Sequence, residues 1–251
     1  MSTHHTTRPT ALITGGSAGL GYALATALAK RGWHLILDAR GAERLSDAAQ
    51  SLGRHTTVEA RVGSVADAAH RSELVDAAYR AGRLDLLVNN ASELGASPQP
   101  VIADLTEAMF SAVIATNATA PLQLMRNLGD VLSTTEGAVI NLSSDAAVEH
   151  YPGWGAYGAS KAALDHLTGT LSAEHPDIDC YAFDPGDMRT ALHQAAFPDE
   201  DISDRPAPEA VIPALLSLLD TRPPSGRYRA EDLGPHSGES TAAQEHVEVV
   251  S

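Results

Sequence analysis

The sequence predicts an α/β fold, a doubly wound parallel sheet of about seven strands with helices on both faces. Three observations support this prediction. Short apolar segments alternate with longer segments of helical pattern along most of the chain. The connections between apolar segments are long enough for crossover helices, which parallel pairing requires. The first apolar segment also leads directly into a glycine-rich turn and then a helical pattern, which makes a strand–turn–helix unit.

Each expected strand is a short apolar run followed by a helical or turn segment. The first contains the run ALI and ends at the glycine-rich turn, and the last precedes a polar, acidic C-terminal segment. The clearest helix covers residues 154–173, which are rich in Ala, Leu and Ser and contain no proline. We expect strands at residues 10–14, 34–38, 56–60, 84–89, 138–142, 179–183 and 226–228. In such sheets ligands bind beyond the carboxyl ends of the strands.

Composition sets limits on the class of protein. The chain has 251 residues, 43% of them hydrophobic, which suits one domain with a core of good size. The net charge of -15 argues against a nucleic-acid partner or an anionic membrane, because phosphates are bound by clustered cations. No apolar run suggests a membrane span or a signal segment, so we expect a cytoplasmic protein. The single cysteine, Cys180, is expected in a buried strand. The histidines show no ligand spacing, so no metal is expected.

The glycine-rich turn reads TGGSAGLG over residues 14–21. Gly15, Gly19 and Gly21 would let the backbone approach a pyrophosphate closely. A helix beginning near Gly19 would direct its unpaired N–H groups and its positive dipole end at the same group. The spacing differs from the usual Gly-x-Gly-x-x-Gly fingerprint, but its strand–turn–helix context is the same. The turn therefore predicts a dinucleotide-binding site.

Tyr157 and Lys161 form the most informative pair of side chains. The chain has six tyrosines and only two lysines among seventeen basic residues, so a Tyr-x-x-x-Lys spacing seldom arises by chance. In a helix the two residues lie on the same face, one turn apart. A cation close to a phenol favours the phenolate and lowers its pKa from about 10. The pair is expected to carry a proton in catalysis; an amphipathic tyrosine beside a solvated lysine is the alternative.

Five motifs together resemble a known family. They are TGGSAGLG, NNAS at residues 89–92, INLSS at 140–144, YGASK at 157–161 and DPG at 184–186. Their order and spacing are similar to those of the short-chain dehydrogenases/reductases, over residues 9–228. The resemblance implies a single Rossmann-type domain over residues 9–230. It also implies an oxidoreductase that transfers hydride between a nicotinamide cofactor and a small-molecule carbonyl or alcohol.

The resemblance implies four catalytic residues, Asn117, Ser144, Tyr157 and Lys161. Ser144 would hydrogen-bond the substrate carbonyl, and Tyr157 would protonate the developing alkoxide during reduction. Lys161 would lower the pKa of Tyr157 and bind the nicotinamide ribose. Asn117 would anchor a water of the proton relay. Without the resemblance, an asparagine inside a helix that bonds its own backbone explains Asn117 nearly as well.

Cofactor contacts are expected where the motifs meet at the strand ends. Two positions depart from the family pattern, because Ser92 replaces a usual glycine and Ser64 a common aspartate; neither is expected to touch the reacting atoms. The expected cofactor-binding residues are Gly15, Ser17, Gly19, Leu20, Gly21, Arg40, Ser64, Val65, Asn90, Ala91, Tyr157, Lys161, Pro185, Gly186 and Thr190.

Cofactor preference is encoded after the second strand, which reads LILDARGAERL. The resemblance places the ribose-binding acid of NAD enzymes at Ala39 and the phosphate-binding base of NADP enzymes at Arg40. A guanidinium suits a 2′-phosphate, so NADP(H) is favoured. NAD(H) stays open as the alternative, because an end of the strand shifted by one residue would bring Asp38 to the ribose. A solvated Arg40 is also possible.

The substrate is expected to be an uncharged, moderately apolar ketone or secondary alcohol. Ser144, Tyr151, Trp154 and Met188 are the expected substrate contacts. The segment 187–208 is expected to form a loop-like lid, whose acidic residues disfavour a strongly anionic substrate.

Other functions remain compatible with the sequence. They are an NAD-dependent dehydrogenase, an epimerase or dehydratase with bound cofactor, and a non-catalytic NADP-binding regulator, against which the intact catalytic set argues. The resemblance further implies a homodimer or homotetramer through the helices that contain Asn117 and Tyr157. Residues 1–8 are expected to be a flexible tail, and the polar residues 231–251 a disordered acidic tail.

Overall fold

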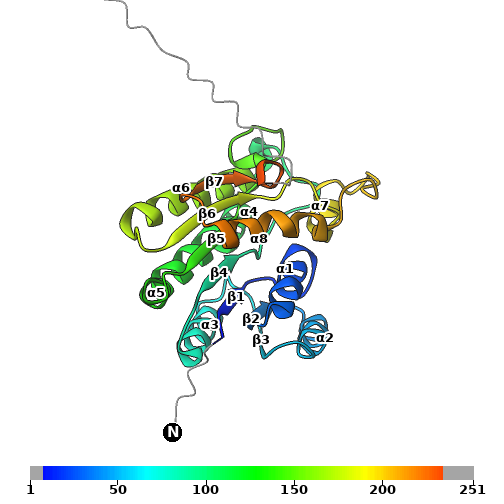
Figure 1. Cartoon of the computed structure of the whole chain (residues 1–251). Helices are drawn as coiled ribbons and strands as arrows, with labels where there is room; N and C mark the ends of the chain where they lie inside the picture. Colours follow the sequence, from blue (N-terminus) through cyan, green and yellow to red (C-terminus); the bar gives the residue numbers. More distant parts are fainter. Residues whose placement is uncertain (1–7, 234–251) are drawn as a thin grey trace, which may run out of the picture.

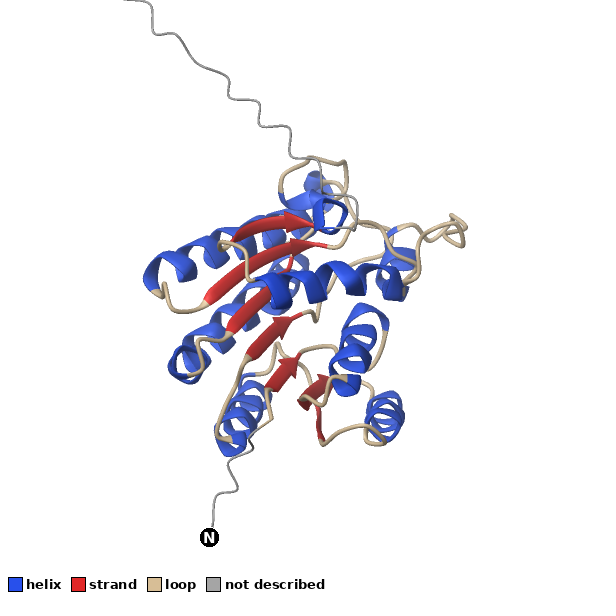
Figure 2. Ribbon diagram, in the orientation of Figure 1, coloured by secondary structure: helices blue, strands red, loops and turns tan. Residues whose placement is uncertain are grey.

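A computed structural model of the chain describes residues 8–233. Within them, seven parallel strands form one sheet with helices on both faces (Figures 1 and 2). The predicted fold class is confirmed. The strands are β1 (Thr10–Ile13), β2 (His34–Ala39), β3 (Val58–Val62), β4 (Leu86–Asn89), β5 (Ala138–Leu142), β6 (Asp179–Asp184) and β7 (Gly226–Arg229). The helices are α1 (Gly19–Lys30), α2 (Ala42–Leu52), α3 (Ala68–Ala81), α4 (Glu107–Ile114), α5 (Ala120–Thr134), α6 (Gly155–Glu174), α7 (Ala191–Ala196) and α8 (Ile212–Thr221).

The sheet separates two apolar cores. On β1, Ala11 and Ile13 belong to the core that includes α1, α2 and α8, whereas Leu12 belongs to the core of α3 and α5. Successive side chains of a strand point to opposite faces, so a sheet covered on both sides needs apolar residues at nearly every position. This requirement explains the short continuous apolar runs from which the strands were predicted.

The strand order is β3-β2-β1-β4-β5-β6-β7, and it reverses between β1 and β4. The chain first runs outward from β1 to β3, returns to β4 beside β1, and then runs outward to β7. Such a reversal leaves a crevice beyond the carboxyl ends of the strands. The glycine-rich turn follows β1, and the NNAS, INLSS and DPG motifs lie at the ends of β4, β5 and β6. The fold thus gathers these motifs at one edge of the sheet.

The observed strands differ from the predicted ranges by at most two residues at either end. The largest differences, of two residues, are at both ends of β3 and at the start of β4. Thr56 lies before β3, and its hydroxyl donates to the Trp33 carbonyl at 2.6 Å. Cys180 is buried in β6, as predicted, and burial raises the pKa of its thiol to about 12.

The described structure continues slightly beyond the predicted end of the domain at residue 230. A short 3-10 turn covers Ala230–Leu233. The remainder of the two predicted tails lies outside the described residues. Among residues 8–233, no helix is long and apolar enough to cross a membrane.

Candidate active site

A cavity of about 680 Å³ opens at the carboxyl edge of the sheet. Its volume lies in the range of small-molecule binding sites. One end is lined by the glycine-rich turn, Arg40 and residues 63–65, and the other by Ser144, Trp154 and Tyr157. All the predicted cofactor-binding residues line this cavity except Gly21. One basic residue that was not predicted, Arg44 in the first turn of α2, lines it as well.

The glycine-rich turn forms a backbone cradle at one end of the cavity. Gly15 and Gly19 have φ angles of 66° and 55°, a conformation that side chains disfavour. Gly21 has a packing role instead, because a Cβ there would lie 2.5 Å from Asn90 Nδ2. Helix α1 starts after Ala18, which offers no side-chain cap to the first N–H groups. These donors are free for an anionic ligand, so this end fits a cofactor diphosphate.

Asp38 supports this turn from behind. Its side chain is 2% exposed, its Oδ1 accepts a hydrogen bond from Gly15 N at 2.8 Å, and its Oδ2 lies 3.0 Å from His70 Nε2. Strand β2 runs one residue further than predicted, to Ala39, so the ligand-facing position begins after Asp38. The alternative in which Asp38 meets the cofactor ribose therefore finds no support in this structure.

Arg40 lies at the rim of the cavity. Its side chain is 72% exposed, and its Nη1 bonds Glu93 Oε2 at 2.9 Å. Both residues line the cavity, Arg40 after β2 and Glu93 after β4. With Arg44 nearby on α2, this rim presents two guanidinium groups, the side chains best suited to bind a phosphate.

Tyr157 and Lys161 lie one turn apart on α6, as predicted, and both are buried. Lys161 Nζ donates to the Leu142 carbonyl at 2.6 Å and lies 5.4 Å from the centroid of the Tyr157 ring. Burial raises the pKa of Tyr157 to about 12, although hydrogen bonds with Ser92 and Ser144 oppose this rise. Burial also lowers the pKa of Lys161 to about 8. In this structure the pKa of Tyr157 is raised and not lowered as predicted, because burial disfavours the charged phenolate.

Ser92 is a site residue that the sequence analysis placed away from the chemistry. Its hydroxyl forms a hydrogen bond with Tyr157 and lies 3.4 Å from Asn117 Oδ1. The sequence did show a serine in place of the usual glycine. Only the folded chain shows that this serine lies against the phenol.

Asn117 lies in a π-helical turn, Ala115–Thr119, between α4 and α5. Its Oδ1 accepts a hydrogen bond from Glu93 N at 2.8 Å, and its Nδ2 donates to the Glu93 carbonyl and to Ser160 Oγ. Asn117 does not line the cavity, whereas its neighbour Thr116 does. The alternative of an asparagine bonded to its own backbone is wrong. Its amide instead holds the segment after β4 against α6. The prediction that Asn117 anchors a water of the proton relay stays untested.

Ser144 lies two residues after the end of β5 and lines the cavity. Its hydroxyl donates to Asp145 Oδ1 at 2.8 Å. The Tyr151 hydroxyl donates to Asp145 Oδ2, also at 2.8 Å. Tyr151 is exposed and is not part of the cavity wall, so its predicted substrate contact is not seen. Tyr151 reaches the site only through Asp145.

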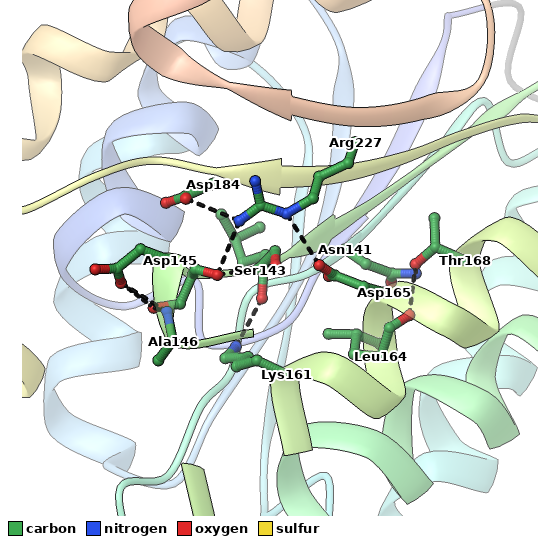
Figure 3. Close-up of polar contacts among 12 residues, drawn as sticks. Asn141, Ser143, Asp145, Ala146, Lys161, Leu164, Asp165, Thr168, Asp184 and Arg227 are labelled. Carbon is green, nitrogen blue, oxygen red and sulfur yellow. Dashed lines mark hydrogen bonds and ion pairs between the residues drawn. The ribbon is translucent and has the colours of Figure 1, made fainter. Parts of the chain in front are cut away.

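An ion-pair network centred on Arg227 lies beside the site (Figure 3). Arg227 of β7 bonds Asp165 of α6 at 3.1 Å and Asp184 of β6 at 3.0 Å. The same guanidinium donates to the Ser144 carbonyl at 2.9 Å. Asp165 follows Lys161 by one helical turn, and Asp165 and Asp184 both raise the pKa of Lys161 against the effect of burial. Arg227 thus links α6, β6 and the segment after β5, which hold the predicted catalytic residues Lys161 and Ser144.

The wall around Tyr157 is largely apolar. Leu94, Ala146 and Tyr157 form a small core with Trp154 and Leu192, and the rings of Trp154 and Tyr157 meet edge to face at 5.6 Å. The predicted substrate contacts Trp154 and Met188 line the cavity.

The segment 187–208 borders this wall but is not simply loop-like, because it contains α7. Thr190 caps α7 by accepting from His193 N. Arg189 N donates to the Pro206 carbonyl at 2.8 Å, which joins the two ends of the segment. The lid prediction itself stays untested.

Comparison with known proteins identifies the family. The model of the short chain dehydrogenase family matches residues 9–201. The chain belongs to this family. Its members are oxidoreductases that bind nicotinamide cofactors, and the resemblance seen in the five motifs is confirmed.

Among relatives within the short-chain dehydrogenase family, ketoacyl reductase 1 of the granaticin polyketide synthase of Streptomyces violaceoruber is 34% identical over 192 residues, or 74% of this chain and 70% of that one. Sulfoacetaldehyde reductase 2 of Chromohalobacter salexigens is 36% identical over 65% of each chain. The matched region thus spans about two thirds of these relatives. The alcohol dehydrogenase of Thermococcus sibiricus, solved with 5-hydroxy-NADP, has a TM-score of 0.80 and 27% identity, covering 88% of this chain and 95% of its own.

Proposed function

We propose that the protein is an NADP(H)-dependent carbonyl reductase or secondary alcohol dehydrogenase that acts on small molecules. One observation carries the proposal: Ser144, Tyr157 and Lys161 face one end of a cavity whose other end has Arg40 and Arg44 at its rim. The structure of the relative with 5-hydroxy-NADP is consistent with this cofactor class. We further propose that the active protein is cytoplasmic, and that it is a homodimer or homotetramer, as the family resemblance implies.

The residues along the cavity fit the parts of the cofactor. The free N–H groups at the start of α1 would hold the diphosphate, and Arg40 with Arg44 would hold the 2′-phosphate. Residues 63–65 would border the adenine, and Lys161 would bind the nicotinamide ribose. Because Asp38 is engaged by Gly15 and His70, no carboxylate at the end of β2 opposes the 2′-phosphate.

The proposed chemistry follows from the protonation states of the side chains around the cavity. NADPH, when bound, would supply the hydride for the carbonyl carbon. The Ser144 hydroxyl would donate to the carbonyl oxygen, and the Tyr157 phenol would deliver the proton as the C=O bond becomes an alcohol. A pKa raised to about 12 keeps this phenol protonated at neutral pH, which suits an acid in the reductive direction. Lys161 is charged below about pH 8, and it would stabilise the negative charge of the phenolate that Tyr157 becomes after it gives up its proton. In oxidation the proton moves the opposite way.

The proposal is tested by titrating the protein with NADPH and NADH and following energy transfer from Trp154, which lines the cavity. Carbonyl reduction is then measured, with Tyr157→Phe as the matched control. We expect tighter binding of NADPH and turnover in the wild type only. Failure to bind either cofactor contradicts the proposal. Binding without any turnover indicates a regulator, and conversion without net cofactor oxidation indicates an epimerase or dehydratase.

A further inference from the structure

Asp145 places a carboxylate beside the hydroxyl proposed to hold the substrate carbonyl. Ser144 Oγ and Ala146 N both donate to Asp145 Oδ1 at 2.8 Å, and the Tyr151 hydroxyl donates to Oδ2. These hydrogen bonds outweigh burial and lower the pKa of Asp145, so the group is charged. Three donors fill three of the roughly four acceptor positions of a carboxylate. Asp145 also lines the cavity, next to Ser144.

The Ser144 hydroxyl has a single proton, which its 2.8 Å hydrogen bond gives to Asp145 Oδ1, whereas the protonated Tyr157 phenol can donate to the Ser144 oxygen. The Ser144 proton cannot be given to Asp145 and to a substrate carbonyl at the same time. When a ketone binds as proposed, Asp145 loses a donor. Hydrogen bonds to charged acceptors are the strong kind, so this loss opposes binding unless another donor replaces Ser144. A simple ketone brings no donor, whereas a ketone with a hydroxyl or amino group on the adjacent carbon does.

Electrostatics also leave Asp145 open to such a donor. The cation that acts on Asp145 is Arg229, and the Arg229 guanidinium is itself bound to Glu231 at 2.9 Å. The three close partners of Asp145 are neutral hydroxyl and amide groups. A hydrogen-bond donor from the substrate can therefore stabilise the charge of this carboxylate when Ser144 turns to the carbonyl oxygen.

We infer that the substrate is a ketone with a hydrogen-bond donor on the carbon next to the carbonyl, with an α-hydroxy ketone as the simplest case. This inference rests on the proposed function. The carbonyl oxygen accepts from Ser144 and Tyr157, and the α-hydroxyl donates to Asp145 in place of Ser144. Adjacent groups of the substrate thus meet side chains that are adjacent in the chain. Hydride from the reduced cofactor goes to the carbonyl carbon and the Tyr157 proton to its oxygen, which yields a vicinal diol and oxidised cofactor while the α-hydroxyl is unchanged.

The apolar residues around Tyr157 indicate which group the substrate carries on the other side of the carbonyl. Leu94, Trp154 and Leu192 pack with Tyr157 in one apolar cluster, and the Trp154 ring meets the Tyr157 ring edge to face. A phenyl or alkyl group is therefore suited to this wall. An aryl ketone with a polar α-carbon satisfies both the wall and Asp145.

The test compares two ketones of nearly equal size, 2-hydroxy-1-phenylethanone and propiophenone. They differ only in that the first has a hydroxyl on the α-carbon where the second has a methyl group. For each variant the result is the ratio of their kcat/KM values with NADPH, so effects common to both ketones cancel. We expect the wild type to prefer the hydroxy ketone at least about tenfold and Asp145→Ala to lose most of this preference. A tenfold ratio corresponds to about 1.4 kcal/mol. An α-hydroxyl also makes the carbonyl more reactive, which favours the hydroxy ketone in every variant. The inference is therefore tested by the change in the kcat/KM ratio between the wild type and Asp145→Ala.

Two further variants separate hydrogen bonding from charge. Asp145→Asn keeps an acceptor for Ala146 N and so keeps the turn. It should retain part of the preference for the hydroxy ketone over propiophenone. It should lose any preference for 2-amino-1-phenylethanone over propiophenone, because the negative charge is gone. Glu149→Gln removes a carboxylate from the same loop, outside the cavity wall, and should leave both ratios unchanged. Equal kcat/KM for the two ketones in the wild type, or a ratio that survives in Asp145→Ala, overturns the inference while the proposed function stands. No turnover of either ketone by the wild type overturns both.

Discussion

Replacing Arg227 with glutamine should lower stability and also move the pH dependence of catalysis. The change removes an ion pair with Asp165, an ion pair with Asp184 and a hydrogen bond to the Ser144 carbonyl. The side chain of Asp184 is only 4% exposed and that of Arg227 is 27% exposed. Removing one partner of a buried pair costs about 3–5 kcal/mol, and the partial exposure of Arg227 points to the lower end, about 3 kcal/mol. In a protein of this size that loss lowers Tm by roughly 6–12 °C.

The catalytic effect has a definite sign. Burial lowers the pKa of Lys161 to about 8, so its charge, and with it activity, should be lost as the pH rises through about 8. Asp165 and Asp184 both act to raise this pKa, and Arg227 forms ion pairs with both carboxylates and so weakens their effect on Lys161. Without Arg227 the pKa of Lys161 should rise. The alkaline limb of the kcat/KM profile should therefore move to higher pH in Arg227→Gln.

Thermal unfolding and the pH profile of carbonyl reduction measure the two effects together. Arg227→Lys keeps the charge and should lose stability with a smaller shift of the alkaline limb. Arg31→Gln, which breaks an exposed pair with Asp220, is the matched control and should cost about 0–1 kcal/mol. If Arg227→Gln behaves like Arg31→Gln in both assays, the network does not support the site and the reasoning is refuted.

Three other changes test the cofactor and catalytic assignments. Tyr157→Phe should reduce kcat by about 10²–10⁴ with unchanged NADPH affinity, measured by steady-state kinetics and titration; near-normal turnover contradicts the assignment of the acid. Arg40→Ala should weaken NADPH far more than NADH in paired titrations, while Arg54→Ala, an exposed change outside the cavity, should weaken neither. Asp38→Asn should lower stability by about 1 kcal/mol and weaken both cofactors alike, because it loosens the turn at Gly15. A loss confined to NADH would instead mean that this residue meets the ribose.

Much of the fold could be predicted from the sequence because its signals are local. The run ALI of β1, the glycine turn that follows it and the proline-free helix α6 each lie within a short stretch of chain. A buried parallel strand requires apolar residues on both faces, so its run is continuous and easy to find. The strand ends also fix where the motifs meet, which is why the cavity contains nearly all the predicted contacts.

The rest could not be predicted because it depends on contacts between distant segments. Arg227 bonds Asp165 and the Ser144 carbonyl across 62 and 83 positions of the chain. The contact of Ser92 with Tyr157 likewise joins the end of β4 to α6. The raised pKa of Tyr157 was missed for a related reason. Spacing reveals a neighbouring lysine, but the degree of burial follows from the packing of the whole domain.

The neighbouring positions Asp38 and Arg40 divide two tasks that could have fallen on one residue. One side chain turns inward and secures the glycine turn, and the other extends to the rim of the cavity. Selection or design can therefore alter the rim, for example with Arg40→Ser, without disturbing the turn on which any dinucleotide depends. Under the proposed NADP(H) preference, a change of cofactor would need substitutions after β2 only, and the glycine turn would stay as it is.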